Sequence, residues 1–177
     1  MTTIEKSSKT KTNINEPISS LFNEAKLPKK LLESYLQFLN TDAGNTIQKQ
    51  LIMFFSQPEK TANFTPIFIY HEAQNIISTF MASKHHVPPE PGECGSILSY
   101  VRASGKDENY LYSDCYGQLS CSSCAVEILA GTVENPTPRE EEYDMLDIDE
   151  NRPPTDQTRL SCQAKVGSTP LVLKIRK

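Results

Sequence analysis

The spacing of apolar residues changes near Phe64 and divides the chain into a helical part and a part with strands. Between residues 17 and 57, apolar side chains recur every three or four positions, which predicts amphipathic helices. One apolar run follows Pro28, a residue favoured at helix starts. Gly44 separates that run from a second one. The two runs comprise Leu31, Leu32, Tyr35, Leu36 and Leu39, and then Ile47, Leu51, Ile52 and Phe55.

Beyond Phe64, the apolar residues form the short or alternating runs that are typical of strands. Strands are predicted at residues 67–70, 76–81, 126–129 and 171–175. Short helices are predicted at 97–101, where Ser96 can cap the first turn, and at 140–146. The order strand, strand, helix, strand, helix, strand predicts an α+β domain with a small mixed sheet.

The same pattern predicts three segments. Residues 1–16 are polar and lack apolar periodicity, so we expect them to be disordered. Residues 17–60 form a helical extension, and residues 61–177 form the domain with strands. The extension either packs on the main domain or serves to dock a partner, and no motif within it decides between these interpretations.

Composition and charge narrow the function classes. Apolar residues make up 37% of the 177 residues and charged ones 23%, which is enough apolar material for a packed core. The net charge of −4 argues against nucleic-acid binding, which selects a basic face. No apolar run reaches the roughly 18–20 residues of a membrane span. We expect a bacterial cytoplasmic protein, with the mitochondrial matrix as the alternative, because the Lys/Ser/Thr-rich start lacks both arginine and an apolar signal region.

Cysteines carry the candidate chemistry. Their number, five, is odd, and without a secretory signal this argues for metal binding or redox chemistry over a disulfide framework. Cys115, Cys121 and Cys124 have the spacing C-x5-C-x2-C, and 37 residues separate them from Cys162. A [2Fe–2S] cluster needs four thiolates. One loop can supply three of them, and a distant segment folded against the loop can supply the fourth.

The composition of the cysteine loop suits that task. Gly117 permits the positive φ of a tight turn. The small residues Ser120, Ser122 and Ser123 let backbone N–H groups approach the sulfur atoms, where hydrogen bonds tune the reduction potential.

Three other uses of the cysteines fit this spacing less well. Structural zinc usually takes two short cysteine pairs, whereas only one pair here is short. A thiol–disulfide motif at Cys121 and Cys124 leaves the other two cysteines unexplained. A Rieske centre needs two histidine ligands, and the histidines all lie upstream of the cysteine loop, at His71, His85 and His86. The fifth cysteine, Cys94, is interpreted as a small, partly buried residue at a helix entry, or as a thiol open to oxidation.

The cysteine spacing resembles that of the adrenodoxin-like [2Fe–2S] ferredoxins, because plant-type ferredoxins have one residue fewer between the first two ligands. The acidic stretch that follows is similar to that family's recognition helix, with its D-M-L-D core at residues 144–147. The segment Arg159-Leu160-Ser161-Cys162-Gln163 resembles the family's fourth-ligand motif. The resemblance covers roughly residues 64–177.

The resemblance implies a β-grasp fold and a [2Fe–2S] cluster, with Cys115 and Cys121 on the outer iron and Cys124 and Cys162 on the inner one. It implies a one-electron carrier, not an enzyme. The donor would be an NAD(P)H-dependent ferredoxin reductase. The acceptor would be the iron–sulfur cluster assembly machinery or a cytochrome P450-type oxygenase. The alternative from another class is a non-redox interaction module that holds structural zinc. Ala125 departs from the family, which commonly has histidine directly after the third ligand.

The acidic stretch is also the predicted partner-docking surface. Like charges on one helix face repel one another and destabilise the helix. Acidic side chains in the first turn are the exception, because the positive end of the helix dipole stabilises them. Charge on a carrier's surface raises the rate of association with basic partners. The predicted docking residues are Glu140, Glu141, Glu142, Asp144 and Asp147. A further hypothesis makes the helical extension a regulatory element that restricts access to the cluster.

Overall fold

The computed structural model describes residues 13–57, 63–105 and 110–176. The helices are α1 (Asn15–Glu24), α2 (Lys29–Leu39), α3 (Asn45–Ser56), α4 (Ile97–Ala103) and α5 (Glu140–Leu146). The strands are β1 (Phe64–His71), β2 (Ile76–Ser83), β3 (Ala125–Ala130), β4 (Thr158–Leu160) and β5 (Leu171–Ile175). None of the helices in these ranges has the length and hydropathy to cross a bilayer.

The five strands form one mixed sheet in the order β2-β1-β5-β3-β4. β1 and β2 are an antiparallel hairpin, and β5 lies between β1 and β3, parallel to the first and antiparallel to the second. β4 completes the far edge, antiparallel to β3. This is the α+β architecture with a small mixed sheet that the sequence pattern predicts, and it agrees with the β-grasp fold that the family resemblance implies.

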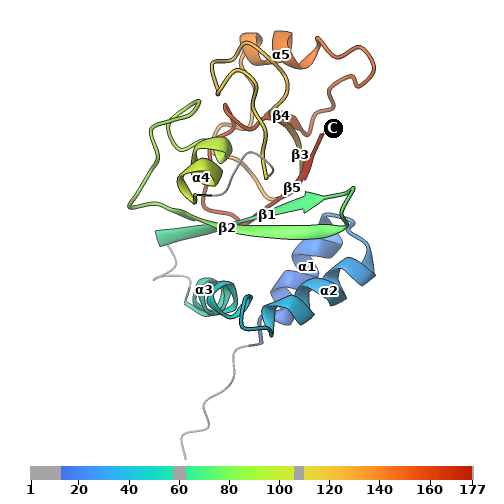
Figure 1. Ribbon diagram of the computed structural model, residues 1–177, viewed down its shortest axis with the longest axis vertical. Helices are drawn as coiled ribbons and strands as arrows, with labels where there is room; N and C mark the ends of the chain where they lie inside the picture. The colour runs from blue at the N-terminus through green and yellow to red at the C-terminus, as the bar shows by residue number, and fades with distance from the viewer. Residues whose placement is uncertain (1–12, 58–62, 106–109, 177) are drawn as a thin grey trace, which may run out of the picture.

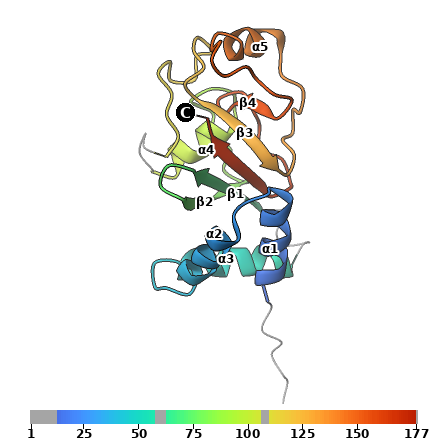
Figure 2. The ribbon, with the colours of Figure 1, turned by 90° about the vertical axis from the view of Figure 1, so that its right-hand side faces the viewer.

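The sheet has a hydrophobic core on each face, because successive side chains of a strand point to opposite sides. In β1, Ile67 and Ile69 enter the core beneath α4, whereas Phe68 enters the core beneath the N-terminal helices. In β5, Leu173 joins the first core and Val172 the second. The helices α1–α3 lie on one side of the sheet, and α4, α5 and the long loops lie on the other (Figures 1 and 2).

The N-terminal helices are fixed to the sheet by aromatic contacts. Phe22 of α1 and Tyr35 of α2 meet Phe68 edge-on, with ring centroids 5.6 and 5.9 Å apart. The Tyr35 hydroxyl lies 2.6 Å from the Thr79 hydroxyl of β2, and burial raises the pKa of Tyr35. The helical extension therefore packs on the main domain, as the first of the two interpretations expects.

The observed elements follow the predicted ones, with two differences. β4 was not predicted, because its three residues show no alternation and pair with β3 only through the tertiary fold. Of the segment expected to be disordered, residues 1–12 lie outside the described residues. Residues 13–16 are ordered instead: Ile14 is buried and α1 begins at Asn15.

Candidate metal centre

Three of the four predicted ligands lie in the long loop between α4 and β3. This loop turns sharply at Tyr116, Gly117 and Leu119, which all have positive φ values, between 52° and 82°. The Gly117 N–H donates to the Ser113 hydroxyl and the Asp114 N–H to the Ser123 hydroxyl, at 3.1 and 2.8 Å. These bonds close the loop on itself, and Figures 1 and 2 show it beside α5.

The four cysteines meet as two pairs. The thiols of Cys115 and Cys121 are in contact, and both residues are half-buried. The thiols of Cys124 and Cys162 are also in contact, and both side chains are fully buried. Cys124 immediately precedes β3 and Cys162 follows β4, so the pairing of these two strands brings the second pair together. The fold thus assembles an outer and an inner pair from segments far apart in sequence.

The surroundings of Cys115, in the outer pair, favour its thiolate form. Burial raises the pKa of Cys115, but hydrogen bonds from the Ser120 N–H and hydroxyl, the Cys121 thiol and the Gly117 N–H outweigh it and lower that pKa to about 6. The Ser123 hydroxyl lies 3.1 Å from the sulfur of Cys121. The sequence predicts only that the small serines let backbone N–H groups approach sulfur; in the structure the hydroxyls of Ser120 and Ser123 also contact sulfur atoms.

The two thiols of the inner pair have pKa values shifted in opposite directions. The hydrogen bond from the Cys162 thiol lowers the pKa of Cys124, despite its burial. The same bond, together with burial, raises the pKa of Cys162. Gln163 donates an N–H to the sulfur of Cys162, at 3.4 Å, and opposes that rise.

The space around the cysteines suits a compact inorganic group. At Gly92, a Cβ atom would lie 2.8 Å from that of Cys162, and at Gly117 a Cβ would collide with the backbone of Gly92. The Ser161 hydroxyl is fully buried beside the Cys124 thiol, and its hydrogen bond to that thiol contributes to the lowered pKa of Cys124. Two glycines thus allow three backbone segments to close tightly around four soft sulfur donors.

No group of three or more His, Cys, Asp or Glu side chains among the described residues converges on a single point. The two cysteine pairs are the arrangement that a cluster of two irons requires, with two thiolates for each iron. Gly92 was not singled out from the sequence. The Pro91-Gly92 dipeptide is a turn signal, but only the fold reveals that it touches the fourth cysteine.

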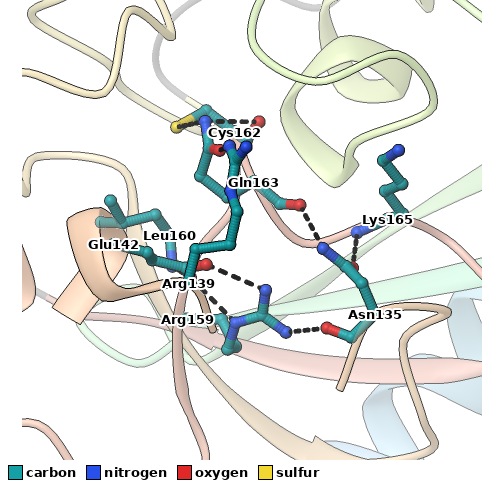
Figure 3. Close-up of polar contacts among 8 residues, drawn as sticks. All are labelled: Asn135, Arg139, Glu142, Arg159, Leu160, Cys162, Gln163 and Lys165. Atoms are coloured by element: carbon teal, nitrogen blue, oxygen red, sulfur yellow. Dashed lines mark hydrogen bonds and ion pairs between the residues drawn. The ribbon is translucent and has the colours of Figure 1, made fainter. Parts of the chain in front are cut away.

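A chain of polar contacts leads outward from Cys162 (Figure 3). Arg139, at the start of α5, donates to the Gln163 side-chain oxygen at 2.6 Å and to Glu93 at 2.9 Å. The Asn135 side chain donates to the Gln163 carbonyl and accepts from the Lys165 N–H. Gln163 is therefore held from two sides.

Glu142 and Arg159 form a buried ion pair next to this chain (Figure 3). The Glu142 carboxylate accepts from Arg159 Nε at 2.8 Å, from Arg159 Nη2 at 3.0 Å and from the Leu160 N–H at 2.8 Å. Arg159 Nη1 donates to the Asn135 carbonyl. Removing one partner of such a pair strands the other charge in the interior, which typically costs about 3–5 kcal/mol. The pair therefore fixes α5 to β4, two residues before Cys162.

The docking prediction is wrong for Glu142 and remains a prediction for the other four residues. Glu142 is 1% exposed, and its carboxylate forms an ion pair with Arg159 instead of facing solvent. Glu142 and Leu146, four positions apart, form the buried face of this short helix, so a charge at position 142 is not a surface charge. The remaining predicted docking residues, Glu140, Glu141, Asp144 and Asp147, are all exposed.

The other candidate residues lie apart from the cysteine pairs. Cys94 is exposed and lines a separate surface pocket with Lys84 and Tyr100. His71 contacts the Ser78 hydroxyl at the hairpin, and His85 contacts Asn63. None of the three was proposed as a ligand.

Ala125, which stands where the resembling family commonly has histidine, is buried, and its carbonyl accepts the Arg176 N–H at 3.2 Å. The Arg176 guanidinium reaches the carbonyls of Arg152 and Pro153. In this chain the connection from the cysteine loop to the loop after α5 therefore runs through the main chain of Ala125 and the side chain of Arg176.

Comparison with known families gives a match over the site. Residues 90–167 match the family described as "2Fe-2S iron-sulfur cluster binding domain", and this segment contains all four paired cysteines. No curated protein sequence is significantly similar to the chain.

Several solved structures are similar at low identity. A ferredoxin from Rhodopseudomonas palustris is 21% identical, with 63% of this chain and 96% of that chain covered and a TM-score of 0.46. A variant of putidaredoxin, a Fe2S2 ferredoxin, is 18% identical, with 63% and 95% covered and a TM-score of 0.45. The ISC-like [2Fe-2S] ferredoxin from Pseudomonas putida is 22% identical, with 64% and 93% covered and a TM-score of 0.42. The family match alone carries the assignment of a cofactor.

Proposed function

We propose that this ferredoxin-type electron carrier, whose [2Fe–2S] cluster binding domain spans residues 90–167, holds its cluster on Cys115, Cys121, Cys124 and Cys162. The observation that carries the proposal is the meeting of these cysteines as an outer and an inner thiol pair. When bound, a [2Fe–2S] cluster accepts and releases one electron at a time.

The chain's own residues set the conditions for that chemistry. N–H groups of Gly117 and Ser120 point at the outer pair and stabilise negative charge on sulfur. Burial of Cys124 and Cys162 excludes water from the inner pair. The half-buried outer pair leaves one side of the site near the surface, where a partner can approach.

We further propose an NAD(P)H-dependent ferredoxin reductase as the donor. The acceptor is the iron–sulfur cluster assembly machinery or a cytochrome P450-type oxygenase. The exposed carboxylates of α5 support partners with a basic surface, because opposite charges raise association rates. Five free cysteines suit a reducing compartment, the bacterial cytoplasm or the mitochondrial matrix.

The test is the absorbance and EPR spectrum of anaerobically purified full-length protein, before and after dithionite. Visible bands that bleach on reduction, together with a new S = 1/2 signal, are the expected result. A colourless protein with stoichiometric zinc, even after anaerobic cluster reconstitution, would overturn the proposal and leave a structural zinc module.

Replacing Asp144 and Asp147 by asparagine is expected to slow electron transfer from a reductase at low ionic strength and to flatten its salt dependence. Both residues are exposed: Asp144 lies on α5, and Asp147 is the residue directly after its last turn. Removing their charge weakens electrostatic steering without disturbing the buried Glu142. Stopped-flow reduction over a range of salt concentrations measures the effect. The matched control is Asp42→Asn, an exposed acid between α2 and α3, and equal rates for all three proteins would refute a docking role.

A further inference from the structure

The ligand loop and the region of α5 each carry large exposed apolar side chains, and Figures 1 and 2 show the loop beside this helix. Tyr116 lies in the loop and is 59% exposed, Tyr143 lies in α5 and is 49% exposed, and Ile148 follows α5 and is 60% exposed. Of the proposed docking carboxylates, Glu140, Glu141 and Asp144 lie on α5, and Asp147 directly follows it. An apolar group surrounded by charge is the usual composition of a protein contact surface, with an apolar centre and a polar rim.

Tyr116 has a backbone conformation that its own side chain does not favour. Its φ is 52°, in the left-handed region that few residues other than glycine and asparagine adopt. Leu119, in the same loop, has a similar φ of 54°. Its side chain packs against the main core, so apolar burial offsets the cost of this backbone conformation. For the Tyr116 side chain, the described residues provide neither a hydrogen bond nor an aromatic partner.

A largely exposed tyrosine that holds an unfavourable backbone conformation, and makes no side-chain hydrogen bond to the described residues, is a candidate for an external contact. Tyrosine is suited to that task, because it supplies a large rigid contact area and one hydroxyl at a low entropic cost. Tyr116 directly follows Cys115, so a partner that contacts the ring lies next to the outer thiol pair.

We propose that Tyr116 is the apolar contact through which this carrier seats a redox protein whose surface has an apolar centre ringed by lysine or arginine. The carboxylates of α5 steer such a partner, and Tyr116 fixes its position once the two proteins meet. This inference rests on the proposed function. In the transfer step, one electron leaves the reduced carrier and enters the partner's oxidised centre, and no proton or bond is exchanged.

Cytochrome c serves as the probe, because it presents a haem edge surrounded by lysines. The full-length protein is reduced with dithionite, desalted anaerobically and mixed with ferricytochrome c in a stopped-flow instrument. Tyr116→Asn removes the ring but keeps a residue that tolerates positive φ. We expect the second-order rate constant to fall roughly five-fold. Tyr116→Phe, which keeps the ring, is expected to transfer at nearly the wild-type rate.

Two further measurements make the result specific. Met53→Gln changes an exposed apolar residue of α3, on the other side of the sheet, and is expected to leave the rate unchanged. The spectrum and reduction potential of Tyr116→Asn are expected to match those of the wild type. An unchanged rate in that variant would overturn the inference, as would a slower rate that follows a shifted potential. A protein without a visible spectrum before mixing would instead overturn the proposed function and, with it, this inference.

Discussion

Replacement of Cys124 or Cys162 by serine is expected to abolish binding of the cluster. A serine hydroxyl ionises far less readily than a thiol, and its hard oxygen is a weaker ligand than a thiolate for the iron of a cluster. Both side chains are fully buried and in contact with each other, and each supplies one of the two thiols of the inner pair. Absorbance and iron content after anaerobic reconstitution measure the loss.

Cys94→Ser is the matched control for these two variants. Cys94 is exposed and lines a pocket that none of the paired cysteines touches, so this variant is expected to bind as much cluster as the wild type. Normal iron and a normal spectrum in Cys124→Ser or Cys162→Ser would contradict the ligand assignment, as would loss of the cluster in Cys94→Ser.

Replacement of Phe22 by alanine is expected to lower the free energy of unfolding by about 3–5 kcal/mol. Phe22 is 1% exposed and its ring touches both Tyr35 and Phe68, so its removal leaves a cavity between the helical layer and the sheet. For a chain of this size, the melting temperature would fall by on the order of 10 °C. Thermal unfolding followed by circular dichroism measures the shift.

The matched control is Phe38→Ala, because Phe38 lies in α2 but is 37% exposed. Exposed positions usually change stability by less than about 1 kcal/mol on substitution. If Phe22→Ala were no less stable than Phe38→Ala, packing of the helices on the sheet would contribute little to the stability of the fold. That result would favour the interpretation of residues 17–60 as a partner-docking element.

Local signals in the sequence predicted the elements that local physics determines. The Ser96 hydroxyl accepts the Ser99 N–H at 3.1 Å, as expected of a helix cap. The acidic helix has the predicted bounds, Glu140–Leu146. Three glutamates in its first turn stabilise this start of the helix, because they interact favourably with the positive end of the helix dipole. The cysteine spacing singled out Cys115, Cys121, Cys124 and Cys162, which the fold places as two pairs; their role as ligands stays a prediction.

The features that the sequence did not predict depend on partners distant in the chain. β4 is a strand because β3 pairs with it, and Gly92 is confined because Cys162 packs against it. Glu142 differs from its exposed neighbours only in that Arg159, seventeen positions later, reaches it in the interior. The sequence shows that each of these residues is charged, small or apolar, but only the topology shows which residue it meets.

The central position of β5 couples the two sides of the molecule during synthesis. β1 leaves the ribosome more than a hundred residues before β5, its parallel neighbour, so the sheet stays divided until that late strand emerges. Side chains of β5 then enter both cores, with Val172 on the helical side and Leu173 on the side of the cysteines. The helical layer and the cluster-binding side therefore reach their final packing in one event. A defect in either is expected to delay the maturation of both.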